Sequence, residues 1–330
     1  TGRSAGRAEN RAPGKSGALP RARFSARPLR GCPDALVRCG RHAALVTDAT
    51  FPSGLDALPP RDVATKAEAV GETKAGMDAV TTFVLAVLAG AFIALGAVFS
   101  TTVAAGAAEL PYGVARLLAG LAFSLGLVLV VVAGAELFTG NNLIVMAWAS
   151  RRVSTVRLLR NWGIVYAGNL VGALGTAVLV LVSGQYDYGK GSVGATALSI
   201  GVAKTSLDPV EAVALGILCN ALVCLAVWMA YSARSVTDKV LAVVPPITAF
   251  VAAGFEHSIA NMYFLPYALL VKDTTDVAET AEGVPDLSGL TWGDAIVGNI
   301  LPVTLGNVIG GGVLVGAVYW FAFLRKRPVT

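Results

Sequence analysis

Long apolar stretches alternate with short polar ones along most of this chain. As helices, six of them are long enough to cross about 30 Å of hydrocarbon. They are residues 81–105, 112–149, 161–183, 209–233, 240–270 and 293–323. The pattern predicts an all-α membrane protein with six transmembrane helices.

The second and fifth stretches are too long for one straight helix. Each has a charged residue and a Gly- and Asn-containing interruption near its middle, with Glu136 in the second stretch and Glu256 in the fifth. Paired interruptions of this kind are typical of discontinuous helices in transporters. We therefore expect helices two and five to be broken.

The two halves of the chain repeat one another. Residues 133–141 read AGAELFTGN and residues 253–261 read AGFEHSIAN, so Ala, Gly, Glu and Asn coincide at a constant offset. Three spans per half is an odd number, so the second half must be inverted in the membrane. Two inverted three-helix repeats place the permeation site at the midplane, between the two breaks.

Asparagine pairs and glycines repeat in the same way in spans three and six. Asn161 and Asn169 stand eight residues apart, as do Asn299 and Asn307. A Gly follows the second Asn of each pair three residues later, and we expect these glycines to let helices pack closely. They are Gly172 and Gly310.

Basic residues predict the orientation in the membrane. Arg151, Arg152, Arg157 and Arg160 lie between spans two and three, and Arg325, Lys326 and Arg327 follow span six. The loop at 273–286, on the opposite side, is acidic. Both termini are therefore expected on the cytoplasmic side, or on the stromal or matrix side of an organelle membrane.

Residues 1–57 differ in composition from the rest. Residues 1–45 hold ten Lys and Arg against two acidic residues, with no apolar run, as in organelle transit peptides. The alternative is a disordered tail or upstream sequence. The transit interpretation places the protein in the chloroplast inner envelope, with the plasma membrane or the mitochondrial inner membrane as alternatives.

The composition excludes several other classes of function. Outside the leader the acidic residues slightly outnumber the basic ones, so the net charge of +5 does not indicate nucleic-acid binding. Cys219 and Cys224 lie in an apolar helix without further ligands at metal spacing. With no metal or cofactor motif and no clustered acid–base pair, we expect neither a metal site nor a cofactor, and no enzyme.

Ionisable residues at membrane depth are costly and mark functional positions. Glu136 and Glu256 are equivalent in the repeat, which favours a structural role: accepting hydrogen bonds from backbone N–H groups freed at the breaks. The same support role is expected for the repeated amides of Asn141, Asn261, Asn169 and Asn307.

Two other polar residues are candidates for contact with a solute. His257 is the only histidine outside the leader and lies inside the fifth span, where it either lines the pore or is a satisfied core histidine. Lys204 is expected in the loop that enters span four. It either extends to the interface or, as the lone cation near an acidic face, attracts anions.

Several motifs resemble the formate/nitrite transporter family over about residues 58–326. They are AELFTGN, NWGIVYAGNLVGAL, GILCNALVCLAVWMAYSARS, FVAAGFEHSIANM and NILPVTLGNVIGGG. The resemblance implies an interfacial amphipathic helix at 58–78, an aquaporin-like channel domain at 79–326 and a tail at 327–330. It also implies a homopentamer in the lipid bilayer, with one pore in each protomer.

The resemblance also implies roles for individual residues. Phe250 lines one hydrophobic constriction, and Phe123, Leu127 and Leu137 match apolar positions of the other. Thr139 and His257 match the facing polar residues between them. Lys204 and Asn220 match residues that attract and orient the anion, which favours the second interpretation of Lys204.

The expected function is a channel or transporter for small monovalent weak-acid anions, nitrite or formate, with proton exchange at His257. A channel of the same fold for hydrosulfide or another small anion is one alternative. A neutral-solute pore for water or glycerol is the other, because an aquaporin-like layout permits it.

Overall fold

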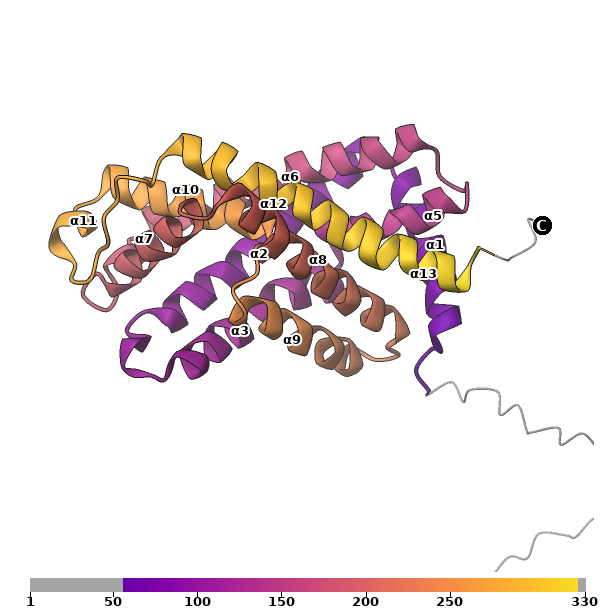
Figure 1. The fold of residues 1–330 in the computed structure, drawn as a ribbon, viewed down its shortest axis with the longest axis horizontal. Coiled ribbons are helices and arrows are strands. Elements are labelled where there is room, and N and C mark those ends of the chain that lie inside the picture. Colours follow the sequence, from indigo (N-terminus) through magenta and orange to yellow (C-terminus); the bar gives the residue numbers. More distant parts are fainter. Residues whose placement is uncertain (1–55, 326–330) are drawn as a thin grey trace, which may run out of the picture. The chain divides into compact units, whose positions relative to one another are not determined.

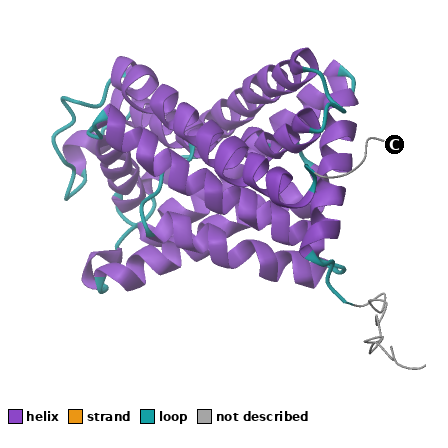
Figure 2. Cartoon of the chain, turned by 45° about the vertical axis from the view of Figure 1, so that its right-hand side comes forward, coloured by secondary structure: helices purple, strands orange, loops and turns teal. Residues whose placement is uncertain are grey.

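The computed structural model describes residues 56–325, whose regular elements are helices joined by short loops (Figures 1 and 2). Most of the predicted leader and the predicted tail lie outside the described residues. Five helices in the described part are long and apolar enough to cross a membrane. They are Ala79–Ala104 (α2), Tyr112–Gly134, Thr155–Val182 (α6), Pro209–Ser232 (α8) and Asp294–Phe323.

Both predicted helix breaks are confirmed. The second span runs through α3 (Tyr112–Leu129) and the π-helical turn η2 (Val130–Gly134), then stops. It resumes in three short pieces: α4 (Phe138–Asn141), η3 (Asn142–Ile144) and α5 (Val145–Ala149). The fifth span is two 17-residue helices, α9 (Val236–Ala252) and α10 (Ser258–Thr274), and is therefore not one continuous spanning helix.

A left-handed glycine ends the first half of each broken helix. Gly134 has φ 83° and Gly254 has φ 79°, a region that costs an L-residue about 1–2 kcal/mol. The next residue then closes the turn, with Ala135 N–H donating to the Val130 carbonyl and Phe255 N–H to that of Phe250. This is a Schellman-type C-terminus, repeated in both halves.

Span six is continuous, but part of it is wound as π-helix. Its segments in chain order are η5 (Asp294–Ile300), α12 (Leu301–Val308), η6 (Ile309–Ala317) and α13 (Val318–Phe323). The described residues also form the short connections η1 (Ala107–Glu109), η4 (Gln185–Asp187) and α11 (Val277–Thr280).

Equivalent helices of the two repeats pack in equivalent ways. Helix α2 packs along α6, and α8 packs along α12. Helices α3 and α9, one from each half, lie side by side (Figure 1). A Cβ added at Gly172 would lie 2.0 Å from the Val87 carbonyl oxygen, and one at Gly310 2.2 Å from that of Ile217. The expectation that these repeated glycines permit close packing is confirmed.

The predicted N-terminal helix is present as α1 (Pro60–Gly76). Its buried side, which includes Val63, Ala64 and Ala67, packs against Met146 and Trp228 of other helices. Helix α1 is therefore docked onto the spanning helices, and its interfacial position stays a prediction.

A helix that the sequence pattern did not predict lies between spans three and four. Helix α7 (Ser192–Thr205) has 14 residues, too few to span a bilayer, and is rich in small residues with little helical periodicity. It packs against α10, which supplies the burial that the local sequence does not encode.

Candidate functional site

The first helix break is held by a buried carboxylate. Glu136 follows the break glycine and is 6% exposed at its side chain. Its Oε1 lies 2.6 Å from the Lys74 ammonium of α1, and its Oε2 accepts from Asn141 Nδ2 at 2.7 Å. The Asn141 amide also donates to Asn161 Oδ1, at 3.0 Å, which ties the break to α6.

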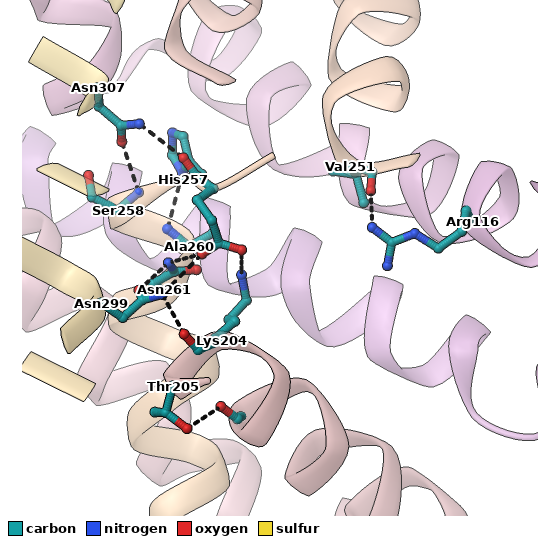
Figure 3. A network of polar contacts seen from close by, with 12 residues as sticks. Arg116, Lys204, Thr205, Val251, His257, Ser258, Ala260, Asn261, Asn299 and Asn307 are labelled. Carbon is teal, nitrogen blue, oxygen red and sulfur yellow. Dashed lines mark hydrogen bonds and ion pairs between the residues drawn. The ribbon is translucent and has the colours of Figure 1, made fainter. Parts of the chain in front are cut away.

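The second break repeats this arrangement (Figure 3). The Lys204 ammonium of α7 lies 2.8 Å from Glu256 Oε1, and Asn261 Nδ2 donates to Oε2 at 2.6 Å. Asn261 also donates to Asn299 Oδ1, at 2.6 Å. Each half of the chain therefore builds a lysine, a glutamate and two asparagines into one buried network.

A third asparagine in each half satisfies the backbone at the break. Asn169 Oδ1 accepts from Phe138 N–H at 2.9 Å, and its amide donates to the carbonyls of Ala86 and Glu136. Asn307 does the same for Ser258 N–H, as Figure 3 shows. The support role expected of the amides is therefore present at Asn169 and Asn307. The glutamates were also expected to accept freed backbone N–H groups, and that was wrong, because their carboxylates bind side chains.

One polar residue from each half meets at the centre. Thr139 Oγ1 lies 2.9 Å from His257 Nε2, and both side chains are buried. His257 is also the N-cap of α10, where its Nδ1 accepts from Ala260 N–H at 3.1 Å. A neutral ring with an acceptor at Nδ1 carries its proton on Nε2, so Nε2–H donates to Thr139.

The two halves differ at this central pair. At the repeat offset, Leu137 occupies the position equivalent to His257, and Ile259 the position equivalent to Thr139. The network around the glutamates is therefore duplicated, whereas the central polar pair occurs once.

A cavity opens on each side of the central pair, and the two share no lining residue. The α1-side cavity, about 440 Å³, is lined by Lys74, Glu136, Leu127 and Leu137, among others. The α7-side cavity, about 420 Å³, is lined by Lys204, Glu256, His257, Phe123 and Phe250, among others.

The apolar residues implied by the resemblance divide between the two cavities. Phe123 and Phe250 meet edge to face, with ring centroids 5.6 Å apart, and Phe250 lies 5.9 Å from the His257 ring. Leu127 and Leu137 line the other cavity. Phe123 was grouped with these leucines from the sequence. It belongs instead with Phe250, because it lies one helical turn before Leu127 on α3.

The structure corrects two statements about Lys204. It lies in the last turn of α7 rather than in a loop, because the unpredicted helix extends to Thr205. It is also not the lone cation of its surroundings. Arg116 of α3 lines the same cavity and donates to the carbonyls of Val251 and Ala252 at the end of α9 (Figure 3).

Asn220 lies apart from both cavities. It is fully buried on α8, and its amide donates to Asn142 Oδ1 at 2.8 Å and to the carbonyls of Asn307 and Thr139. These contacts join the two breaks to one another. Orientation of an anion by Asn220 stays a prediction.

Sequence reasoning missed Lys74 and Arg116 as site residues. Lys74 was part of a helix expected at the membrane surface, where a lysine is unremarkable. The repeat gave no signal for it, because a lysine precedes the break glutamate by 62 residues in one half and by 52 in the other, off the repeat offset. Arg116 gave no signal either, since its partners are backbone carbonyls.

The described residues contain no grouping of His, Cys, Asp and Glu suited to hold a metal ion. Cys219 and Cys224 are free and buried on α8.

Comparison with known proteins gives one consistent result. The family model described as formate/nitrite transporter matches residues 61–321. The formate channel FocA of Escherichia coli K12 is 47% identical over 275 residues, 82% of this chain and 96% of the relative. A probable formate transporter of Methanothermobacter thermautotrophicus is 36% identical over 283 residues, 81% of this chain and 97% of the relative.

The comparison with solved structures gives the same family. A pentameric formate channel with formate bound matches at TM-score 0.68 and 45% identity, covering 75% of this chain and 98% of that one. An ion channel of the same family matches at TM-score 0.67 and 30% identity, covering 79% and 98%. The chain therefore belongs to the formate/nitrite transporter family, whose members are membrane channels and transporters rather than enzymes.

Proposed function

We propose that this protein conducts small monovalent weak-acid anions, formate and nitrite, through a pore in each protomer. The observation that carries the proposal is the Thr139–His257 pair between two cavities that each contain a lysine. Formate is supported by the names of the similar channels, and nitrite by the description of the family.

The apolar residues beside the central pair oppose the passage of a bare anion. Phe123 and Phe250 lie on one side of the pair, and Leu127 and Leu137 on the other. Stripping water from a charge among such side chains costs many kcal/mol unless the charge is compensated. A weak acid avoids this cost if it crosses in its neutral form, so a proton donor at the centre lowers the barrier.

His257 is the proposed proton donor. In the observed geometry its Nε2–H faces Thr139 Oγ1, and an entering carboxylate or nitrite oxygen replaces Thr139 as acceptor. Giving up the Nε2 proton from a neutral ring would leave an imidazolate. Proton exchange therefore requires a second proton on Nδ1, taken up from water, which displaces the Ala260 N–H from that atom. Transfer of the Nε2 proton to the anion then leaves a neutral ring protonated on Nδ1, and the neutral acid returns its proton to water on the far side. The proposed relay thus couples proton transfer to release of the α10 N-cap.

The two alternative substrates predict different behaviour. Hydrosulfide or another small monovalent weak-acid anion would use the same residues, so flux measurements must rank these anions. A neutral-solute pore for water or glycerol has no use for lysines that line a cavity without a carboxylate partner. Lys66 and Lys239 of the α1-side cavity, which have no such partner among residues 56–325, therefore favour the anion channel.

We also propose that the protein works as a homopentamer in a lipid bilayer, as in the similar channel with formate bound. Large apolar side chains are exposed on α2, α3, α6 and α8, as expected of surfaces that face lipid or other protomers. A plastid inner envelope, with both termini in the stroma, remains the prediction from the leader, most of which lies outside the described residues.

The test is stopped-flow uptake of formate, nitrite, hydrosulfide and glycerol into proteoliposomes that hold the full chain. Uptake of formate or nitrite above that of empty liposomes is expected, and their rates rank the substrates. Glycerol uptake without anion flux would overturn the proposed function and favour the neutral-solute pore.

A further inference from the structure

The charges that line the two cavities are unequal. The α1-side cavity has three lysines and one glutamate, a formal charge of +2: Lys66, Lys74, Lys239 and Glu136. The α7-side cavity has two cations and two carboxylates, a formal charge of zero without His257: Arg116, Lys204, Glu211 and Glu256. The repeat therefore duplicates the buried network, but the charge that lines the two cavities is not duplicated.

The lysines of the two networks are not the source of this difference. Lys74 and Lys204 are each paired with a glutamate, at 2.6 and 2.8 Å, and their side chains are 21% and 15% exposed. Each pair contributes little net charge at a distance. The excess positive charge of the α1-side cavity comes from Lys66 on α1 and Lys239 on α9.

Neither of these two lysines is neutralised. No carboxylate among residues 56–325 forms an ion pair with Lys66 or Lys239. The carboxylate nearest to Lys239 in sequence, Asp238, instead accepts from the backbone N–H groups of Arg234 and Ser235 in a capping box.

Lys66 is held in place by a neutral acceptor. Its ammonium donates to the Tyr231 carbonyl at the C-terminal end of α8, at 2.7 Å, which fixes its position without cancelling its charge. Burial lowers the pKa of Lys66, and the charges of Lys239 and then Arg234 lower it further. Two cations without a carboxylate partner in the described part of the chain, Lys66 and Lys239, therefore line this cavity.

We propose that Lys66 and Lys239 form an anion-collecting entrance on the α1 side, and that anions enter faster from this side than from the α7 side. This inference rests on the proposed function. Like charges that line a cavity raise the local concentration of the opposite ion and its entry rate, by about 10-fold or more at low salt. Lys74 and Lys204, each paired with a glutamate, then interact with the anion deeper in the pore.

The test measures formate flux through the full chain, in vesicles of known orientation and at formate concentrations far below saturation, with the ionic strength varied on the α1 side alone. The variants are Lys239→Gln and the double variant Lys66→Gln/Lys239→Gln. Arg61→Gln is the matched control, because Arg61 is an exposed cation of α1 that lines neither cavity. The measurement is made at ionic strengths of about 20 mM and about 500 mM. Because salt screens exposed charges, an electrostatic effect of the two lysines on anion entry disappears at the higher ionic strength.

At low ionic strength on the α1 side we expect the double variant to lose at least about 3-fold of the formate flux, and Lys239→Gln to lose part of it. At high ionic strength both should match the wild type, and Arg61→Gln should match it throughout. Unchanged low-salt flux in the double variant would overturn the inference, as would a loss that persists at high salt. Absence of formate flux in the wild type would instead overturn the proposed function.

Discussion

Thr139 Oγ1 and His257 Nε2 lie 2.9 Å apart at the point where the two inverted repeats meet, although the two residues are not equivalent in the repeat. The symmetric parts of the site, the lysine–glutamate–asparagine networks, hold the breaks open and stable. In the proposed mechanism the asymmetric pair supplies an N–H and a hydroxyl to an acid that passes between the two cavities. The proposal thus separates residues that support the pore from residues that act on the solute.

Thr139→Val should destabilise the protein while Thr139→Ser preserves its stability. Valine has nearly the same shape but leaves His257 Nε2–H without its acceptor, and an unsatisfied buried donor costs about 1–3 kcal/mol. Thermal unfolding of the two variants side by side tests this, and equal stability of both would contradict the hydrogen bond between the central pair.

Lys74→Met should destabilise the protein by about 3 kcal/mol, because it leaves Glu136 buried without its counter-charge. The double variant Lys74→Met/Glu136→Gln should recover much of that loss, since both charges are then absent. Thermal unfolding in detergent measures both.

The pair Lys204→Met and Lys204→Met/Glu256→Gln provides the matched test in the other half. It should give the same order of stabilities. Double variants no more stable than the single ones would contradict the ion-pair account of both networks.

Gly134→Ala should lower stability by about 1 kcal/mol through backbone strain alone. Its φ is 83°, and a Cβ there would meet no atom within 4 Å, so steric overlap does not contribute. Gly175→Ala is the control, because this exposed position in α6 is right-handed helix with equally open space. The control should be neutral or stabilising in thermal unfolding, and a Gly134→Ala protein as stable as it would contradict the strained break.

Much of this architecture was readable in the sequence because burial in a bilayer leaves strong patterns. The six spans, both breaks and the inverted repeat followed from long apolar runs and from the matched AGAELFTGN and AGFEHSIAN segments. The residue types at the breaks also marked His257, Glu136 and Glu256, and the family resemblance marked Thr139; all four lie at the two breaks.

Other features were missing from the prediction because they depend on tertiary contacts. Helix α7 is short and weakly patterned, and forms against α10. Lys74 reaches Glu136 only because α1 docks against the spanning helices, and Arg116 is recognised by carbonyls that carry no sequence signature. The donors to the two glutamates were misassigned for the same reason: sequence indicates a need for hydrogen bonds but not which neighbour meets it.

Formate uptake by wild type, His257→Phe and His42→Phe proteoliposomes tests the central claim most directly. His42, the only other histidine of the chain, provides the matched control. Uptake is measured at about pH 5.5 and about pH 7.5, on either side of the ordinary histidine pKa. The account predicts pH-dependent uptake in the wild type and in His42→Phe. It predicts a loss of about 100-fold in His257→Phe, the lower end of what proton transfer contributes. Wild-type-like uptake by His257→Phe at both pH values would contradict proton exchange at the centre of this pore.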